Sequence, residues 1–263
     1  MLSATPVAAA CRDRVIVWGC IALITVLAWT YLLHLDREMS SSMAHDRMMT
    51  EMGMTMDMPR TSADGFFTFA MWTVMMIGMM AGPATPMLLL FAGMQRTRAS
   101  GPVPMALPSF GLGYLAVWAG FSACAAIAQE ALHRAALLSP GMAASSPRTA
   151  GAIWIAAGVY QLTPFKGACL TSCRSPLGFL MSSWRDGALG AFRMGLRHGL
   201  YCLGCCWALM CVLFAVGVMN LLWVAAISAF VLVEKVGPRG VLASRLAGVA
   251  AAAAGLLLLA RVW

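Results

Sequence analysis

Long uninterrupted apolar runs constrain this chain more than any other feature of its sequence. A helix needs about 20 mostly apolar residues to cross the hydrocarbon core of a bilayer, which is about 30 Å thick. The chain has 263 residues, of which 61% are apolar and only 11% are charged. A β-barrel wall would instead need alternating segments of about ten residues. The sequence therefore predicts an all-α, polytopic helical membrane protein, with residues 1–263 forming a single transmembrane domain.

Seven of these runs are predicted to be membrane helices. The fourth and sixth are short, and the fifth and sixth form one apolar run that must fold back near residues 217–220. Six helices are therefore the alternative. The first run is too long for the core of a signal peptide, so we expect it to be retained as a helix. The predicted helices cover residues 15–35, 66–94, 108–131, 149–165, 198–218, 219–233 and 241–262.

The basic residues predict the orientation of the chain. Arginine supplies nearly all of the positive charge and lies beside the apolar runs, which is typical of membrane topology and not of a nucleic-acid-binding patch. If the N-terminus is cytoplasmic, about twice as many of the 18 Lys and Arg residues lie inside as outside. The positive-inside rule thus predicts an N-in, C-out protein of the bacterial inner membrane, in contact with the lipid bilayer and not with nucleic acid.

Residues 36–64 join the first two predicted helices and are predicted to form a methionine-rich extracytoplasmic loop. A polar loop offers no core for methionine to fill. Thioethers are soft ligands that suit Cu(I), and they cannot be lost to disulfides in an oxidising compartment. We interpret the loop as a flexible copper trap, the alternative being a low-complexity loop with an accidental bias. Its candidate ligands are Met39, Met43, Met48, Met49, Met52, Met54, Met56 and Met58, with His45 among them.

The stretch HGLYCLGCCWALM places one histidine and three cysteines at the start of the fifth predicted helix. None of the nine cysteines falls in a predicted outer loop, so reduced thiols are a simpler interpretation than a disulfide framework. At about 100° per residue, His198, Cys202, Cys205 and Cys206 share one face of the helix. Thiolates and an imidazole on one face can bind a soft or borderline metal. The alternative is ordinary cysteine packing, with His198 at the cytoplasmic end of the helix.

Two further sulfur patterns accompany this face. Cys169 and Cys173 lie four residues apart in the predicted cytoplasmic loop 166–197, where they either complete the metal site or form a redox pair. Met71, Met75 and Met79 form a stripe on the second predicted helix, just before a break expected at its central prolines. The stripe is either core packing or a relay that passes Cu(I) from the outer loop to the cysteines.

Three strings of the sequence resemble a known bacterial family. They are YQLTPFKGACLTSCRSPLGF, GLRHGLYCLGCCWALM and FAVGVMNLLW, and they are followed by a Glu-Lys pair. The family comprises polytopic proteins known as predicted metal-binding integral membrane proteins, some of them labelled copper chaperones. The resemblance runs from about residue 66 to residue 235 and implies metal binding. Its strongest marks are Tyr160, Pro164, Lys166, Cys169, Cys173, Arg174, Pro176, Gly199, Cys202, Gly204, Cys205, Cys206, Trp207, Met219, Asn220, Glu234 and Lys235.

These patterns favour a membrane protein that binds Cu(I), or another soft metal, and acts in copper delivery, uptake or metalloenzyme assembly. Its expected partner is a periplasmic or cytoplasmic copper carrier or a client oxidase. An ATP-driven pump is disfavoured because no ATP-binding loop is visible, and no catalytic residue is predicted. The alternatives are a membrane thiol-disulfide oxidoreductase, whose thiols would cycle through disulfides, and a metal-free scaffold subunit of a membrane complex.

Overall fold

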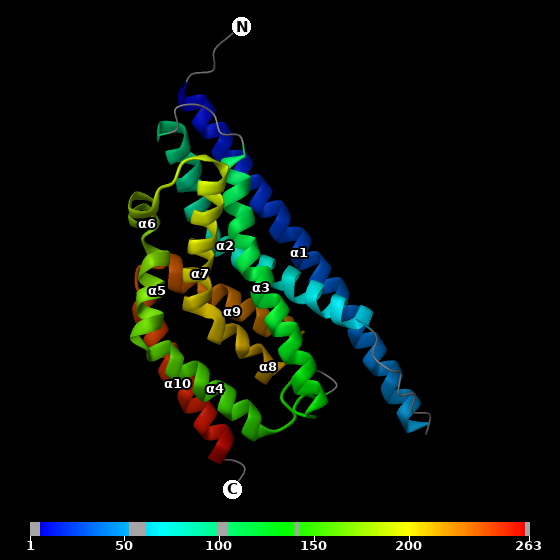
Figure 1. Cartoon of the computed structure of the whole chain (residues 1–263). Coiled ribbons are helices and arrows are strands. Elements are labelled where there is room, and N and C mark those ends of the chain that lie inside the picture. Colours follow the sequence, from blue (N-terminus) through cyan, green and yellow to red (C-terminus); the bar gives the residue numbers. More distant parts are fainter. Residues whose placement is uncertain (1–5, 53–61, 99–104, 140–141, 261–263) are drawn as a thin grey trace.

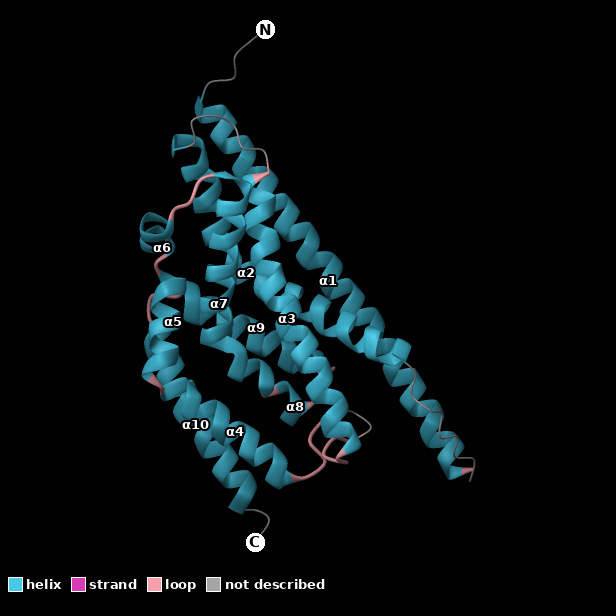
Figure 2. Cartoon of the chain, in the orientation of Figure 1, coloured by secondary structure: helices cyan, strands magenta, loops and turns pink. Residues whose placement is uncertain are grey.

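The computed structural model describes residues 6–52, 62–98, 105–139 and 142–260. These residues form ten α-helices and no β-strand, which confirms the all-α prediction for the described part of the chain (Figure 2). The helices are α1 (Pro6–Glu51), α2 (Ser62–Arg98), α3 (Ala106–Arg134), α4 (Pro147–Leu162), α5 (Pro164–Arg174), α6 (Pro176–Ser183), α7 (Gly187–Cys211), α8 (Leu213–Val216), α9 (Leu221–Val236) and α10 (Gly240–Ala260).

The helices pack as two groups around α7 and α9. Helices α1, α2 and α3 lie along one side of the molecule, and α4 and α10 lie side by side on the other (Figure 1). Helix α7 packs along α3 and also contacts α5, whereas α9 contacts both α2 and α10. The interior between the two groups therefore contains α7 and α9, the two helices that carry the Cys face and the Glu-Lys pair.

Five of the described helices are long and apolar enough to cross a membrane. They lie at Val15–Ser42, Ala63–Gln95, Ala106–Arg134, Gly187–Val216 and Gly240–Ala260. Helices α4 and α9 correspond to the two short predicted spans, and each has 16 residues. At 1.5 Å per residue each is about 24 Å long, less than the hydrocarbon core of about 30 Å. A membrane protein is thus supported, whereas the count of seven crossings stays a prediction.

Helix α1 differs from its prediction because it does not end at residue 35. The helix runs to Glu51, so residues 36–51 are helical and not part of a loop. No glycine or proline occurs between residues 20 and 51, and Met, Ala, Glu and Arg are good helix formers even in a polar stretch. His34 and Glu38 also pair one turn apart, at 3.2 Å. The first part of the predicted loop 36–64 is therefore a continuation of α1.

The predicted cytoplasmic loop 166–197 is also largely helical. It contains most of α5, all of α6 and the first turns of α7, which begins at Gly187 and not at residue 198. Arg193 and Arg197 interrupt the apolar pattern but not the helix, and the Arg197 guanidinium donates to the Ser183 hydroxyl at 3.0 Å. His198 consequently lies inside a long helix, about 16 Å from its start, and does not cap the end of the helix.

Glycines allow two of the helix pairs to approach closely. A Cβ atom on Gly195 of α7 would overlap the carbonyl oxygen of Phe110 in α3. In the other group, a Cβ atom on Gly158 of α4 would lie 2.6 Å from the carbonyl oxygen of Gly248 in α10. Small residues at such contacts let helix backbones pack against each other in membranes, where burial of apolar surface gives no driving force between helices.

Helix α2 continues through both of its prolines and changes direction near its middle (Figure 1). Pro83 has no N–H, so the carbonyl of Met79 lacks its usual helical donor. The hydroxyl of Ser228, from α9, donates to that carbonyl at 3.3 Å. A neighbouring helix therefore satisfies the backbone group that the proline leaves free, as expected for a proline in a membrane helix.

The turn between α8 and α9 lies where the sequence requires the chain to fold back. Gly217 has φ 103°, a left-handed conformation that glycine adopts without steric cost. The Asn220 side chain then accepts a hydrogen bond from the Trp223 N–H at 3.4 Å and caps α9. This turn sends α9 back beside α7.

Candidate functional site

The cysteine face of α7 is buried in the interior of the molecule. Cys202, Cys205 and Cys206 are each at most 2% exposed. The thiols of Cys205 and Cys206 donate to the carbonyl oxygen of Cys202, at 3.0 Å and 2.8 Å. The helical periodicity thus placed three sulfur atoms on one buried face. Cys211 is half-buried, as expected for a residue on another face of the helix.

Helix α5 brings the two other predicted cysteines against this face. Pro164 begins the helix, and the Thr163 hydroxyl caps it by accepting from the N–H of Lys166 at 3.3 Å. The sulfur of Cys173 lies 3.9 Å from that of Cys205. Cys169 packs against Gly204, where an added Cβ atom would come within 2.8 Å of its sulfur. Five cysteine sulfurs therefore gather at the junction of α5 and α7.

Two residues from other helices contact Cys202. The Lys235 ammonium of α9 donates to the Cys202 sulfur at 2.8 Å, and the Tyr114 hydroxyl of α3 lies 3.0 Å from the same sulfur. Lys235 is only 8% exposed. A buried ammonium beside a thiol favours the thiolate, which is the form that binds a metal. The cluster therefore holds its own counter-charge.

A second buried ammonium lies next to the cluster but is neutralised by a carboxylate. Lys166 and Glu234 form an ion pair at 2.7 Å, and the side chains of both are 1% exposed. Gln161 is hydrogen-bonded to both partners, and Arg174 donates to the backbone carbonyl of Glu234. Glu234 therefore lies in the interior of the molecule. The pair fastens α9 to α5.

The pKa values of both α5 thiols are raised, which favours their protonated form. Burial raises the pKa of the Cys169 thiol. The hydrogen-bonded contact with Cys205, together with burial, raises the pKa of the Cys173 thiol. Lys166 does not counteract this effect, because its ammonium is directed at Glu234. A metal that binds these sulfurs must displace their protons.

His198 lies beside a small cavity that joins the cluster to α2. The imidazole is 4% exposed and packs against the rings of Phe110, Tyr114 and Phe179. Its Nδ1 atom is buried without a hydrogen-bond partner, which is costly for a polar atom in an apolar interior. The cavity has a volume of about 190 Å³ and is lined by Pro83, Pro86, Met87, Cys173, Arg174, Pro176, His198, Lys235 and Val236.

The donor set suits a soft metal better than a hard one. Thiolates and thioethers select Cu(I), whereas hard cations need oxygen ligands. Two sulfur ligands of one tetrahedral ion are about 3.8 Å apart, given metal–sulfur bonds of about 2.3 Å, and the Cys173 and Cys205 sulfurs are separated by 3.9 Å. Among the described residues, no three His, Cys, Asp or Glu side chains already converge as a metal site. A third ligand would therefore require a side chain to turn.

The predicted methionine ligands fall into two groups. Met71, Met75 and Met79 are buried in the same apolar cluster as the cysteines of α7, together with the neighbouring Met76 and Met80. At the far end of α1, His45, Met48 and Met52 are exposed and Met49 is half-buried. Their spacing of three and four residues places these four on one face of the helix. Met54, Met56 and Met58 lie outside the described residues, and so does the side chain of Met43.

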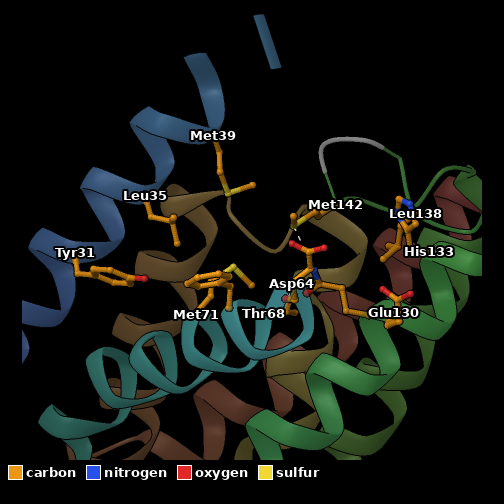
Figure 3. A pocket seen from close by; sticks show the side chains of 12 residues that line it. Tyr31, Leu35, Met39, Asp64, Thr68, Met71, Glu130, His133, Leu138 and Met142 are labelled. Carbon is orange, nitrogen blue, oxygen red and sulfur yellow. Dashed lines mark hydrogen bonds between the residues drawn. The ribbon is translucent and has the colours of Figure 1, made fainter. Parts of the chain in front are cut away.

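A larger and more open pocket lies where α1, α2 and α3 meet (Figure 3). Its volume is about 380 Å³. Met71 lines it, so the α2 methionines begin at this pocket and lead toward the cysteines. The lining residues are Tyr31, Leu35, Met39, Asp64, Phe67, Thr68, Met71, Gln129, Glu130, His133, Leu138 and Met142.

A family model described as PpoB2, a copper chaperone, matches residues 69–258 of the chain, which is more than half of it. The chain belongs to the PpoB2 family. This confirms the resemblance seen in the sequence and supports a copper-related function. The PpoB2 match includes all five clustered cysteines, His198 and the Glu-Lys pair of α9, but not residues 36–64. No curated protein and no solved structure matches the chain.

Sequence reasoning missed Lys235 and Tyr114 as contacts of the thiol cluster. Both contacts are long-range, joining Cys202 to residues 33 and 88 positions away. The Glu-Lys pair at the end of an apolar run was a usable signal for Lys235, because two charges there need buried partners or water. No comparable signal marked Tyr114.

Proposed function

We propose that this PpoB2-family protein is a membrane-embedded copper chaperone that binds Cu(I) at the α5–α7 thiol cluster. The observation that carries the proposal is that the Cys173 and Cys205 sulfurs lie 3.9 Å apart beside Cys202, whose sulfur contacts the buried Lys235 ammonium. A cluster of neutral thiols that binds no metal would need no positive charge beside it. A Cu(I) ion held by two thiolates has a net charge of −1, so one ammonium makes the buried site electrically neutral.

Cys173 and Cys205 provide the first pair of ligands in this proposal, because their sulfurs have a separation that one ion could bridge. The unpartnered Nδ1 atom of His198 is a third donor across the adjoining cavity. Lys235 stays beside Cys202 and compensates the charge of the loaded site. Silver, as the other common soft monovalent ion, would bind in the same way.

The methionines of α2 provide a route to this site. Met71 lines the open pocket, and Pro83 and Met87 line the cavity beside Cys173. Between them, Met75, Met76, Met79 and Met80 are at most 1% exposed. The distance along the helix from Met71 to Pro83 is about 18 Å. Thioethers along this length could pass a soft cation through an interior that offers it no water.

The topology and the partner complete the proposal. Seven crossings, of which α4 and α9 are short, would place the N-terminus in the cytoplasm and the C-terminus outside the bacterial inner membrane. The methionine-rich end of α1 would then face a periplasmic copper carrier, and the thiol cluster would deliver Cu(I) for uptake or to a client oxidase under assembly.

The first test is copper analysis of the full-length protein, purified anaerobically in detergent and loaded with Cu(I). A variant carrying Cys202→Ser, Cys205→Ser and Cys206→Ser should lose the copper that resists a strong Cu(I) chelator. Changing Cys20 and Cys124, which are exposed on the helix surfaces, to Ser is the matched control and should lose none. Retention of wild-type copper by the first variant would refute the proposed site.

A thiol-disulfide oxidoreductase is the second candidate function, because one cysteine pair is close enough to react. The Cys173 and Cys205 sulfurs would have to approach from 3.9 Å to the disulfide length of about 2.05 Å. Mass spectrometry after treatment with a quinone should then find a Cys173–Cys205 disulfide in the wild type. Recovery of only free thiols after this treatment would exclude the oxidoreductase.

A further inference from the structure

The open pocket of Figure 3 contains three methionines from three separate parts of the chain. Met39 comes from α1, Met71 from α2 and Met142 from the segment between α3 and α4. Figure 3 shows their side chains directed into the same opening. Three thioethers without a thiol form a soft and weakly binding ligand set, suited to a monovalent soft cation.

We propose that this pocket is a loading site, at which Met39, Met71 and Met142 take up Cu(I) from the water side before it moves along α2. The inference rests on the proposed function, since it gives the thiol cluster its source of copper. A loading site must bind its ion weakly enough to release it onward. Thioethers meet this requirement better than thiolates, because they carry no charge.

The backbone at Met142 supports a specific role for this residue. Met142 has φ 56°, in the left-handed region of backbone conformation that residues other than Gly, Asn and Asp seldom adopt. The conformation is strained for methionine, and glycine would avoid this strain. The N–H of Met142 donates to Ser139 and its carbonyl accepts from Val218, which hold the residue in this conformation. The strained backbone aims a thioether into the pocket.

A chain of hydrogen bonds fixes the Met142 sulfur in place. The amide nitrogen of Gln129 donates to that sulfur at 3.4 Å. The Gln129 oxygen in turn accepts from the indole N–H of Trp72 at 2.7 Å, and Trp72 is fully buried. The sulfur is therefore positioned by α2 and α3 together.

Charged groups at the rim of the pocket favour the approach of a cation. Asp64, at the start of α2, and Glu130, near the end of α3, line the opening. Glu130 is also paired with Arg134 at 2.8 Å. Carboxylates at the mouth of a cleft raise the local concentration of cations. His133 lines the same rim and adds an imidazole nitrogen to the donors within reach.

The test compares a pocket variant with a control variant in the full-length protein. The pocket variant carries Met39→Leu, Met71→Leu and Met142→Leu, changes that keep the apolar volume and remove the sulfurs. The control carries Met105→Leu, Met181→Leu and Met194→Leu, none of which lines the pocket or the cavity. Thermal unfolding of each variant in detergent checks that it folds. Copper is supplied anaerobically from a Cu(I) chelator, and strongly and weakly held ions are counted separately.

The pocket variant should reach the same content of strongly held copper as the wild type, but at least tenfold more slowly, and it should lose one weakly held ion. The control should match the wild type in both readouts. A pocket variant that loads at the wild-type rate and keeps the weakly held ion would overturn the loading site.

A second comparison separates this inference from the proposed function. The variant with Ser at residues 202, 205 and 206 should lose the strongly held copper and keep the weakly held ion. Adding the three Met→Leu changes to it should remove the weakly held ion as well. If the serine changes remove no copper, the proposed function fails. If the added leucines leave the weakly held ion in place, the loading site fails.

Discussion

Replacement of Lys235 by methionine tests whether the buried ammonium balances the charge of a bound metal. The Lys235 ammonium lies 2.8 Å from the Cys202 sulfur, so it would be roughly 4 Å from the centre of a Cu(I)–dithiolate site, whose net charge of −1 attracts it. Two unit charges at 4 Å interact by about 4 kcal/mol at an effective dielectric constant of 20. Relaxation of the variant would recover part of this energy. We expect Lys235→Met to weaken Cu(I) binding about 100-fold, which corresponds to roughly 3 kcal/mol.

The assay is equilibrium competition with a chromophoric Cu(I) chelator at pH 7, under anaerobic conditions and in detergent. Arg239→Met is the matched control, because it removes a positive charge from an exposed position four residues further along the chain. It should leave the affinity within about twofold of the wild type, since exposed charges at a distance are screened. If Lys235→Met binds Cu(I) as tightly as this control, charge compensation by Lys235 is refuted.

Three further outcomes follow from other features of the structure. Lys166→Met should lower the free energy of unfolding by about 3–5 kcal/mol, because it leaves the Glu234 carboxylate buried and unpaired. Denaturant unfolding should show that adding Glu234→Gln restores part of this free energy. Gly195→Val should lower the unfolding temperature strongly by forcing α3 from α7, whereas Gly120→Val, which meets open space, should leave it within a few degrees. Because the pKa values of both α5 thiols are raised, Cu(I) binding should release protons, which titration in two buffers of different protonation enthalpy can count. The apparent affinity for Cu(I) should therefore rise from pH 6 to pH 8, by up to about tenfold per pH unit for each proton displaced.

The local part of the site could be predicted from the sequence because it depends on one helix. The 100° period alone put Cys202, Cys205 and Cys206 on a common face, and the structure buries that face. The position of His198 could not be predicted in the same way. Hydropathy places the start of the span directly after Arg197. A helix needs backbone hydrogen bonds and not apolar side chains, so α7 begins earlier in the sequence, at Gly187.

The long-range part of the site depended on packing that periodicity does not describe. Charged residues at the end of an apolar run usually mark the boundary of a membrane span, so hydropathy alone places Glu234 and Lys235 at such a boundary. In the structure the adjacent residues are directed at different helices, Glu234 toward Lys166 in α5 and Lys235 toward Cys202 in α7. Only the arrangement of α5, α7 and α9 could reveal that both charges are buried.

The length of α1 sets how a soluble protein could meet this one. The apolar stretch of the helix ends at Ser42, and the helix continues to Glu51, about 14 Å further. The headgroup layer on each side of a bilayer is only about 5–8 Å thick. If the bilayer ends near Ser42, Met48 and Met52, which are 58% and 55% exposed, lie beyond the headgroups. A carrier diffusing in the aqueous compartment could then contact these thioethers by collision, without first docking on the membrane surface.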